Sequence, residues 1–303
     1  MLRSFKEIEQ YVIQSDIKKT IVLSGAHDSY ALEAVIDAKR KGLVNAVLIG
    51  KKKEIEEILT SLNEDKSDYE IIDCQDDKEC TKIAVKLIKE DKADIPMKGL
   101  LQTSDYLKPI LNKQDGLLEA GNVLSQATVV EYSKEDRFFL ITDCAINIDP
   151  DLERKKQLII NSAKLANQLG IEQVKVAAIS ALEIVNPKMS STVDADLLRQ
   201  ANENGEMPGC IVYGPLAFDN AISKEAAMHK HIDSVVAGNA DVILVPEICV
   251  GNALTKSLIF FTDLKMAGAV LGTTAPIIMT SRTDTPENKY NAILIALLQA
   301  LKN

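Results

Sequence analysis

The sequence predicts an α/β fold with mostly parallel sheets. Short apolar runs alternate along the chain with stretches whose apolar residues recur at helical spacing. This alternation is typical of units in which a helix carries the chain back between parallel strands. Expected strands lie at residues 20–24, 46–49, 69–72, 128–131, 138–142, 174–179, 210–213, 242–245, 269–271 and 277–280.

The clearest helical patterns lie at residues 31–41, 78–90, 152–168 and 288–301. The last of them has a well-specified start. Thr285 can accept the hydrogen bond of an N-cap, and Pro286 suits a first turn, where no backbone N–H is needed. Apolar residues then recur on one face, which we expect to pack in the core: Tyr290, Ile293, Leu297 and Leu301.

The bulk composition excludes several classes of protein. A length of 303 residues suits two domains, and a net charge of −9 argues against non-specific binding to nucleic acid or membranes. Five cysteines without a C-x-x-C pair indicate neither a disulfide framework nor a zinc knuckle. The chain starts without a signal-peptide pattern and contains no apolar run of about 18 residues. We therefore expect a cytoplasmic protein.

Several familiar motifs are absent. The turn after the first expected strand lacks G-x-G-x-x-G, and neither a P-loop nor a G-x-S-x-G elbow occurs. His229 and His231 flank one lysine, which favours an exposed turn over a metal pair. We expect no metal site.

The segment from residue 276 to 286 carries the strongest functional signal. An apolar run leads into Ser281, Arg282 and Asp284, and a helix then begins. Ligands bind at the carboxyl ends of strands in open α/β sheets, and helix N-termini attract anions. Arg282 offers a fork of donors that matches phosphate. The structural alternative is a capped helix with a local Arg–Asp pair.

Three further polar loops follow expected strands and precede expected helices. Glycine at such a turn allows a ligand to approach the backbone, and residues four apart share a helix face. Each loop is weak evidence alone, but together they fit a shared cleft. Asp219 and Asn220 have a structural alternative as helix caps. The residues are Lys98, Thr103 and Ser104; Gly214, Asp219 and Asn220; and Gly251, Asn252 and Lys256.

These segments, in this order, resemble the phosphate acetyl/butyryltransferase family, and more closely its butyryltransferase branch. Residues 142–148, 183–189 and 268–272 strengthen the resemblance, which runs almost continuously from 97 to 291. It implies a two-domain fold like that of isocitrate and isopropylmalate dehydrogenases, with the active site in an interdomain cleft. The first domain would contain both chain ends, residues 1–128 and 271–303, and the second would be 129–270. The charged turn at 132–137 is another candidate boundary.

The resemblance also implies exchange of phosphate and coenzyme A on a short acyl group. Acyl-CoA would be a substrate, with no permanently bound cofactor, and the protein would form a homodimer or larger homo-oligomer. Ser281 and Arg282 would serve the oxyanion and the phosphate. The other loop residues would line the substrate site.

Two departures from the family pattern affect the mechanism. The aspartate that the acetyltransferase branch uses as a base is replaced here by Asn288, so Asp284 is the expected base, with Glu287 or water as alternatives. A histidine common in the butyryl branch is replaced by Gln126, and its role cannot be transferred. Cys144 is expected to be a buried or cleft-wall thiol rather than a nucleophile.

Two other functions remain open from the sequence. A non-catalytic acyl-CoA sensor would keep the fold without turnover. A decarboxylating dehydrogenase would need an aspartate cluster for metal and a dinucleotide site, which the sequence does not show. The sequence does not specify the acyl chain or the physiological direction.

Overall fold

The computed structural model describes residues 1–302, which form two compact units. The terminal unit comprises residues 5–122 and 267–302, and the central unit comprises residues 1–4 and 123–266. The domain boundaries expected at 128/129 and 270/271 remain a prediction. The turn at 132–137, however, joins two paired strands of the central unit and is not a boundary between the units.

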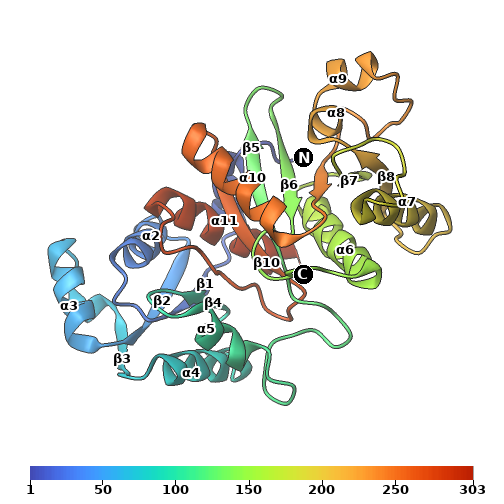
Figure 1. Ribbon diagram of the computed structural model, residues 1–303. Helices are drawn as coiled ribbons and strands as arrows, with labels where there is room; N and C mark the ends of the chain where they lie inside the picture. Colours follow the sequence, from blue (N-terminus) through green and yellow to red (C-terminus); the bar gives the residue numbers. More distant parts are fainter. Residues whose placement is uncertain (303) are drawn as a thin grey trace. The chain divides into compact units, whose positions relative to one another are not determined.

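The terminal unit alternates strands with helices (Figure 1). Its elements are α1 (Phe5–Gln14), β1 (Lys19–Ser24), α2 (Ser29–Arg40), β2 (Val44–Gly50), α3 (Lys52–Ser61), η1 (Lys66–Asp68), β3 (Glu70–Asp73), α4 (Asp77–Lys89), β4 (Ile95–Lys98), α5 (Thr103–Ile110) and α11 (Pro286–Lys302). The strand β10 (Met266–Leu271) begins in the central unit and continues into this one.

Its sheet has the strand order β3-β2-β1-β4, and all three neighbouring pairs are parallel. The strand expected at 277–280 does not form. Its first two residues make single bridges instead, from Ile278 to Met97 and from Ile277 to Val270. Strand β4, which the sequence patterns did not mark, ends at Lys98 and is fully buried.

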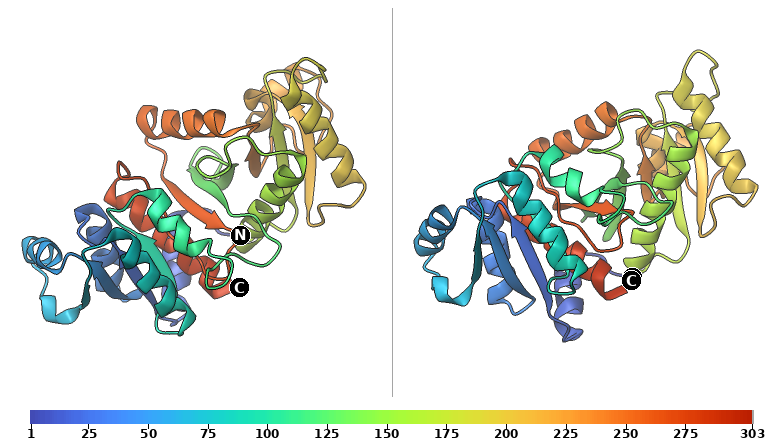
Figure 2. Two further views of the ribbon diagram at one scale, coloured as in Figure 1. Left: turned by 60° about the horizontal axis from the view of Figure 1, so that its bottom comes forward. Right: turned by 90° about the horizontal axis from the view of Figure 1, so that it is seen from below.

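Helices cover this sheet. Helices α4 and α5 lie side by side in all three views (Figures 1 and 2), and α11 packs against α1 and α2. The start of α11 agrees with expectation, since Pro286 is its first residue and the Asn288 N–H donates to Thr285 Oγ1. The face expected to pack in the core does so at Ile293 and Leu297, and burial extends beyond it to all of residues 291–299. Within residues 1–302, no helix has the length and apolar character of a membrane span.

The central unit is also a mixed α/β structure. Its elements are β5 (Ser125–Tyr132), β6 (Arg137–Thr142), α6 (Leu152–Gln168), β7 (Val174–Ile179), α7 (Ser190–Glu203), β8 (Cys210–Leu216), α8 (Phe218–Ile222), α9 (Lys224–His229), β9 (Val242–Leu244) and α10 (Ile248–Phe261).

The second sheet has the strand order β10-β5-β6-β9-β7-β8. Strands β5 and β6 form an antiparallel hairpin, and the following pairs are parallel. Helix α6 begins where the Asp151 carboxylate accepts from the Arg154 N–H, and it packs against β5, β6, β7 and β9. The predicted α/β class with mostly parallel strands is therefore confirmed.

Candidate functional site

The terminal unit brings several site candidates to one edge of its sheet. Strands β1 and β4 are parallel neighbours, so their carboxyl ends meet there. Ile278 extends this arrangement, because its carbonyl accepts from the Lys98 N–H and it bridges Met97 in parallel orientation. Ser281 and Arg282 follow Ile278 closely along the chain, so they lie at the edge where Lys98 ends β4.

A compact turn holds Ser281. The Ser281 N–H donates to Asp284 Oδ2 at 2.7 Å, and the Asp284 N–H donates back to the Ser281 carbonyl at 3.2 Å. The Ser281 hydroxyl lies 3.0 Å from that of Thr283. Asp284 therefore holds the turn and does not pair with Arg282, which removes the expected alternative of a local Arg–Asp ion pair. Among residues 1–302, the Arg282 side chain has no hydrogen-bond or ion-pair partner.

Lys289 supports this turn from the first part of α11. Its side chain is 1% exposed, and Nζ donates to the Ser281 carbonyl at 2.8 Å and to Thr280 Oγ1 at 3.0 Å. Burial lowers the pKa of Lys289, and the carboxylates of Asp28 and Asp284 oppose this shift. The turn is thus fixed to the helix that follows it.

Lys98 is the second buried ammonium group. It is 3% exposed, and Nζ makes one hydrogen bond, to the Gly99 carbonyl at 3.3 Å. Burial lowers its pKa to about 8, with repulsion from Arg282 and Lys289 acting in the same direction. No carboxylate in residues 1–302 lies within 4 Å of these three cations. The edge is therefore cationic and suits an anionic ligand.

Thr103 and Ser104 open α5, soon after β4. Both are exposed, and the N-cap residue Gln102 makes no capping hydrogen bond through its side chain. The hydroxyls and the first backbone N–H groups of this helix are thus available to a ligand.

Gly214 and its neighbours occupy the central unit. Gly214 lies within β8 rather than in a loop, and an added Cβ would meet the Ala178 carbonyl oxygen at 2.6 Å. Asn220 is fully buried and donates to Glu183 at 2.7 Å. The Lys230 ammonium group donates a hydrogen bond to the same Glu183 carboxylate, and its Nζ lies 3.7 Å from Asp219 Oδ2. Packing and this network provide a structural reason for Gly214 and Asn220.

The third loop begins α10. Gly251 is buried, and an added Cβ would lie 2.6 Å from the Asp143 carbonyl oxygen. Asn252 is exposed and donates weakly to the Cys144 carbonyl at 3.5 Å. Lys256 lies one turn further along the helix and has no ion pair among the described residues. Asn252 and Lys256 therefore present adjacent polar groups on one helix.

The Cys144 thiol does not resemble an activated nucleophile. It is 3% exposed, and burial together with the neighbouring Asp143 raises its pKa to about 12. A thiolate is thus not populated near neutral pH. The structure agrees with the interpretation of Cys144 as a buried thiol.

Residues 1–302 contain no group of three or more His, Cys, Asp or Glu side chains that could hold a metal ion. His229 is exposed near Glu225, in line with the expected surface turn.

Sequence patterns missed Lys289 because it lies within a helix that reads as core. Asp28, which caps α2 through the Ala31 N–H, was also missed, although its carboxylate acts on both buried lysines. The signal for Lys289 in the sequence would have been a lysine at the start of a helix whose following residues are mostly apolar.

An α/β fold with unpaired cations at the carboxyl ends of parallel strands defines a class of proteins that act on anionic ligands. Within that class, this chain belongs to the Phosphate acetyl/butaryl transferase family, which it matches over residues 5–86 and 77–297. This confirms the resemblance noted in the sequence.

Individual relatives agree with this family. The chain is 43% identical over 300 residues to the phosphate butyryltransferase of Clostridium acetobutylicum, covering 99% of each chain. A branched-chain phosphotransacylase from Enterococcus faecalis V583 superposes with a TM-score of 0.83 at 31% identity, covering 93% of this chain and 99% of that one. A 4-hydroxythreonine-4-phosphate dehydrogenase from Burkholderia phymatum, at 13% identity and a TM-score of 0.52, covers 94% and 98% and shares the fold alone. The expected dehydrogenase-like fold class is thereby confirmed.

Proposed function

We propose that this protein exchanges phosphate and coenzyme A on a short-chain acyl group. The observation that carries the proposal is the cationic corner of the terminal unit, formed by Lys98, Arg282 and Lys289 without a carboxylate within 4 Å in the described residues. An acyl phosphate would supply the missing negative charge. The relatives named phosphate butyryltransferase and phosphotransacylase catalyse reactions of this class.

In the proposed reaction, the thiolate of coenzyme A attacks the carbonyl carbon of the acyl phosphate. The carbon–sulfur bond forms, the carbon–oxygen bond to phosphate breaks, and phosphate leaves with the bonding electrons. Arg282 binds the phosphate oxygens through its fork of donors, and Lys98 adds a second charge. The Ser281 hydroxyl, held by the turn, donates to the developing oxyanion. Thr103 and Ser104 add donors at the start of α5.

Asp284 is our proposed base for the thiol proton. Its Oδ2 atom holds the turn by accepting from the Ser281 N–H, and Oδ1 has no hydrogen-bond partner among residues 1–302. One carboxylate oxygen is therefore fixed while the other is available to accept a proton. Glu287, in the first turn of α11, and water are the alternatives.

We propose Asn252 and Lys256 as further substrate-binding residues, because they are adjacent on α10 and Lys256 has no ion pair in the described chain. A role for Gly251 beside a ligand also stays a proposal, since its close packing against the Asp143 carbonyl already explains a glycine there. Substrate binding by Gly214, Asp219 and Asn220 also stays a proposal. Packing against Ala178 already explains Gly214, and the hydrogen bond to Glu183 already explains Asn220.

The proposed reaction needs no resident cofactor, because an acyl phosphate is already activated and a thiolate is a strong nucleophile. Purified protein should therefore convert butyryl-CoA and phosphate to free thiol after dialysis against EDTA and without nicotinamide. Comparing acetyl-, propionyl-, butyryl- and branched acyl-CoA would define the acyl preference. Tight acyl-CoA binding without turnover would indicate a sensor instead, and dependence on metal and NAD would indicate a dehydrogenase.

We also propose that the protein is a homodimer or larger homo-oligomer in the cytoplasm. Helix α10 is strongly apolar, yet Phe260 and Phe261 are 71% and 86% exposed. A second copy could cover this surface. The five free cysteines suit a reducing compartment. Light scattering should give a mass of at least twice 33.2 kDa, and changing both phenylalanines to aspartate should lower it. A wild-type mass of 33.2 kDa would contradict the proposed assembly.

A further inference from the structure

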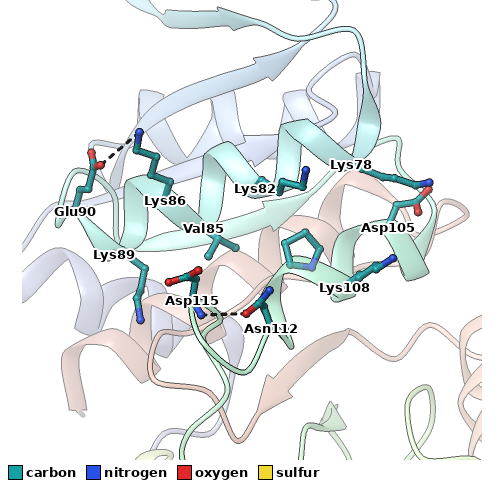
Figure 3. Close-up of a pocket in the computed structure, with 11 residues that line it drawn as sticks. Lys78, Lys82, Val85, Lys86, Lys89, Glu90, Asp105, Lys108, Asn112 and Asp115 are labelled. Carbon is teal, nitrogen blue, oxygen red and sulfur yellow. Dashed lines mark hydrogen bonds and ion pairs between the residues drawn. The ribbon is translucent and has the colours of Figure 1, made fainter.

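A groove separate from the cationic corner lies between α4 and α5 (Figure 3). It has a volume of about 630 Å³, within the range of about 300–1,000 Å³ typical of small-molecule sites. Five lysines line it: Lys78, Lys82, Lys86 and Lys89 from α4, and Lys108 from α5.

The lysines differ in how far their charge is already neutralised. Lys82 pairs with Glu79 at 2.9 Å, and Lys86 lies 3.8 Å from Glu90. Lys78, Lys89 and Lys108, by contrast, have no ion pair among residues 1–302. Because Lys78 and Lys108 come from opposite walls, a single anion in the groove could contact both.

The lining of the groove carries a net positive charge, whereas the whole chain carries a net negative charge. Glu90, Asp105 and Asp115 also line the groove, so five lysines against three carboxylates leave a net charge of +2. The whole chain carries −9. A local excess of positive charge on an acidic protein favours a multiply charged anion at this place.

The lining is not wholly polar. Pro109 from α5 and the small exposed part of Val85 from α4, which is 5% exposed, contribute apolar surface between the lysines. Inorganic phosphate would leave that surface uncovered, whereas a ligand with a flat ring as well as phosphates would cover it. A ligand that carries several negative charges and an apolar group therefore matches this lining better than an inorganic anion does.

We propose that the α4–α5 groove binds a nucleoside di- or triphosphate, with the phosphates between Lys78 and Lys108 and the base against Val85 and Pro109. The ligand is either a free nucleotide or the nucleotide end of a second coenzyme A molecule, which share this chemistry. None of the residues that line the groove is among those proposed for catalysis or substrate binding.

Calorimetric titration with ATP tests the proposal. Wild-type protein should bind ATP saturably, and the double variant Lys78→Gln with Lys108→Gln should bind at least tenfold more weakly, because two charged contacts are lost. The matched control, Lys18→Gln with Lys53→Gln, removes the same charge from exposed sites outside the groove and should bind like wild type. Circular dichroism and turnover of butyryl-CoA should be unchanged in both double variants.

Three results would overturn the proposal: no saturable ATP binding, equal weakening in both double variants, or pyrophosphate binding as tightly as ATP. A parallel titration with coenzyme A distinguishes the two sources. If wild-type protein binds a second equivalent of coenzyme A that the Lys78→Gln, Lys108→Gln variant does not bind, the nucleotide end of coenzyme A is the ligand. If wild-type protein binds ATP but no second equivalent of coenzyme A, the ligand is a free nucleotide. Because turnover is read separately, failure here leaves the proposed transferase activity untouched.

Discussion

At the scale of single residues, the corner depends on cations that are not neutralised by the protein itself. Lys289 is buried but uses its donors on Ser281 and Thr280, so it fixes the turn, whereas the Arg282 side chain has no partner in the described chain. One cation therefore positions the turn, and another is available for substrate.

Arg282→Ala should lower kcat about 10²–10³-fold, because it removes donors from charge that develops on the phosphate and carbonyl oxygens. Arg282→Lys should recover part of the rate, since a point charge replaces only the electrostatic contribution. The rate of thiol release measures both. Arg199→Ala, on the surface helix α7, is the control and should remain fully active; equal rates for Arg282→Ala and wild type would remove Arg282 from the mechanism.

Lys98 should make stability depend on pH. Its folded pKa of about 8 lies below the usual 10.5, so between these values the unfolded chain holds a proton that the folded chain lacks. Stability from this group thus rises with pH across the window, by an amount on the order of 3 kcal/mol. Below pH 8 the buried charge is a penalty.

Lys98→Met removes that penalty, so the variant should gain stability relative to wild type at pH 7 and lose this advantage by pH 10. Urea unfolding at both pH values measures the difference in free energy of unfolding between the variant and wild type. Because other titrating groups contribute equally to both proteins, this difference isolates Lys98. If the stability difference between Lys98→Met and wild type were the same at both pH values, the pKa of Lys98 would not be lowered in the folded protein.

At the scale of elements, the corner requires the ends of β1 and β4 to approach closely. The Gly99 N–H donates to the Ser24 carbonyl at 2.8 Å, and an added Cβ would lie 2.2 Å from the Gly25 carbonyl oxygen. Because the obstacle is backbone, the two chain segments would have to separate. Glycine at 99 therefore sets the position of Lys98 next to it.

Gly99→Ala should destabilise the protein by about 1–3 kcal/mol and lower kcat at least tenfold, since it displaces the end of β4. Gly42→Ala is a useful comparison, because its φ of +75° is strained for alanine while its surroundings are open. That variant should lose stability but keep its turnover. Wild-type kcat for folded Gly99→Ala would show that the close approach is dispensable.

At the scale of the whole molecule, an acidic chain selects anions by local rather than net charge. The net charge of −9 repels phosphate, so the phosphate binding that we propose depends on the local charge of the cationic corner. A ligand that binds the folded state alone stabilises it by RT ln(1 + L/Kd), where L is the concentration of free ligand.

Phosphate should therefore raise the Tm of the wild-type protein. At 100 times its Kd the expected stabilisation is about 2.7 kcal/mol, or several degrees. Scanning calorimetry at constant ionic strength measures the shift, which should shrink in Arg282→Ala and stay in the Lys18→Gln, Lys53→Gln control. The same Tm rise with sodium chloride would indicate a general salt effect.

The sequence by itself determined the order and type of most elements, because periodic apolar residues and capping residues such as Asp151 and Thr285 act locally. It also indicated the family to which the chain belongs, and it led to the proposal that Ser281 and Arg282 act in the site. It did not predict what long-range packing decides: residues 277–278 form bridges rather than a strand, and burial in α11 extends beyond the expected face.

The tertiary structure alone decided which charges meet. Lys98 is more than 180 positions from Arg282 and Lys289 in the sequence, and parallel pairing at the edge of the terminal sheet brings their charges together. The shift in the pKa of Lys98 follows from burial and from those neighbours, neither of which a linear pattern contains. Local propensity depends on residues a few positions apart, whereas the electrostatics of a site depend on distances through space.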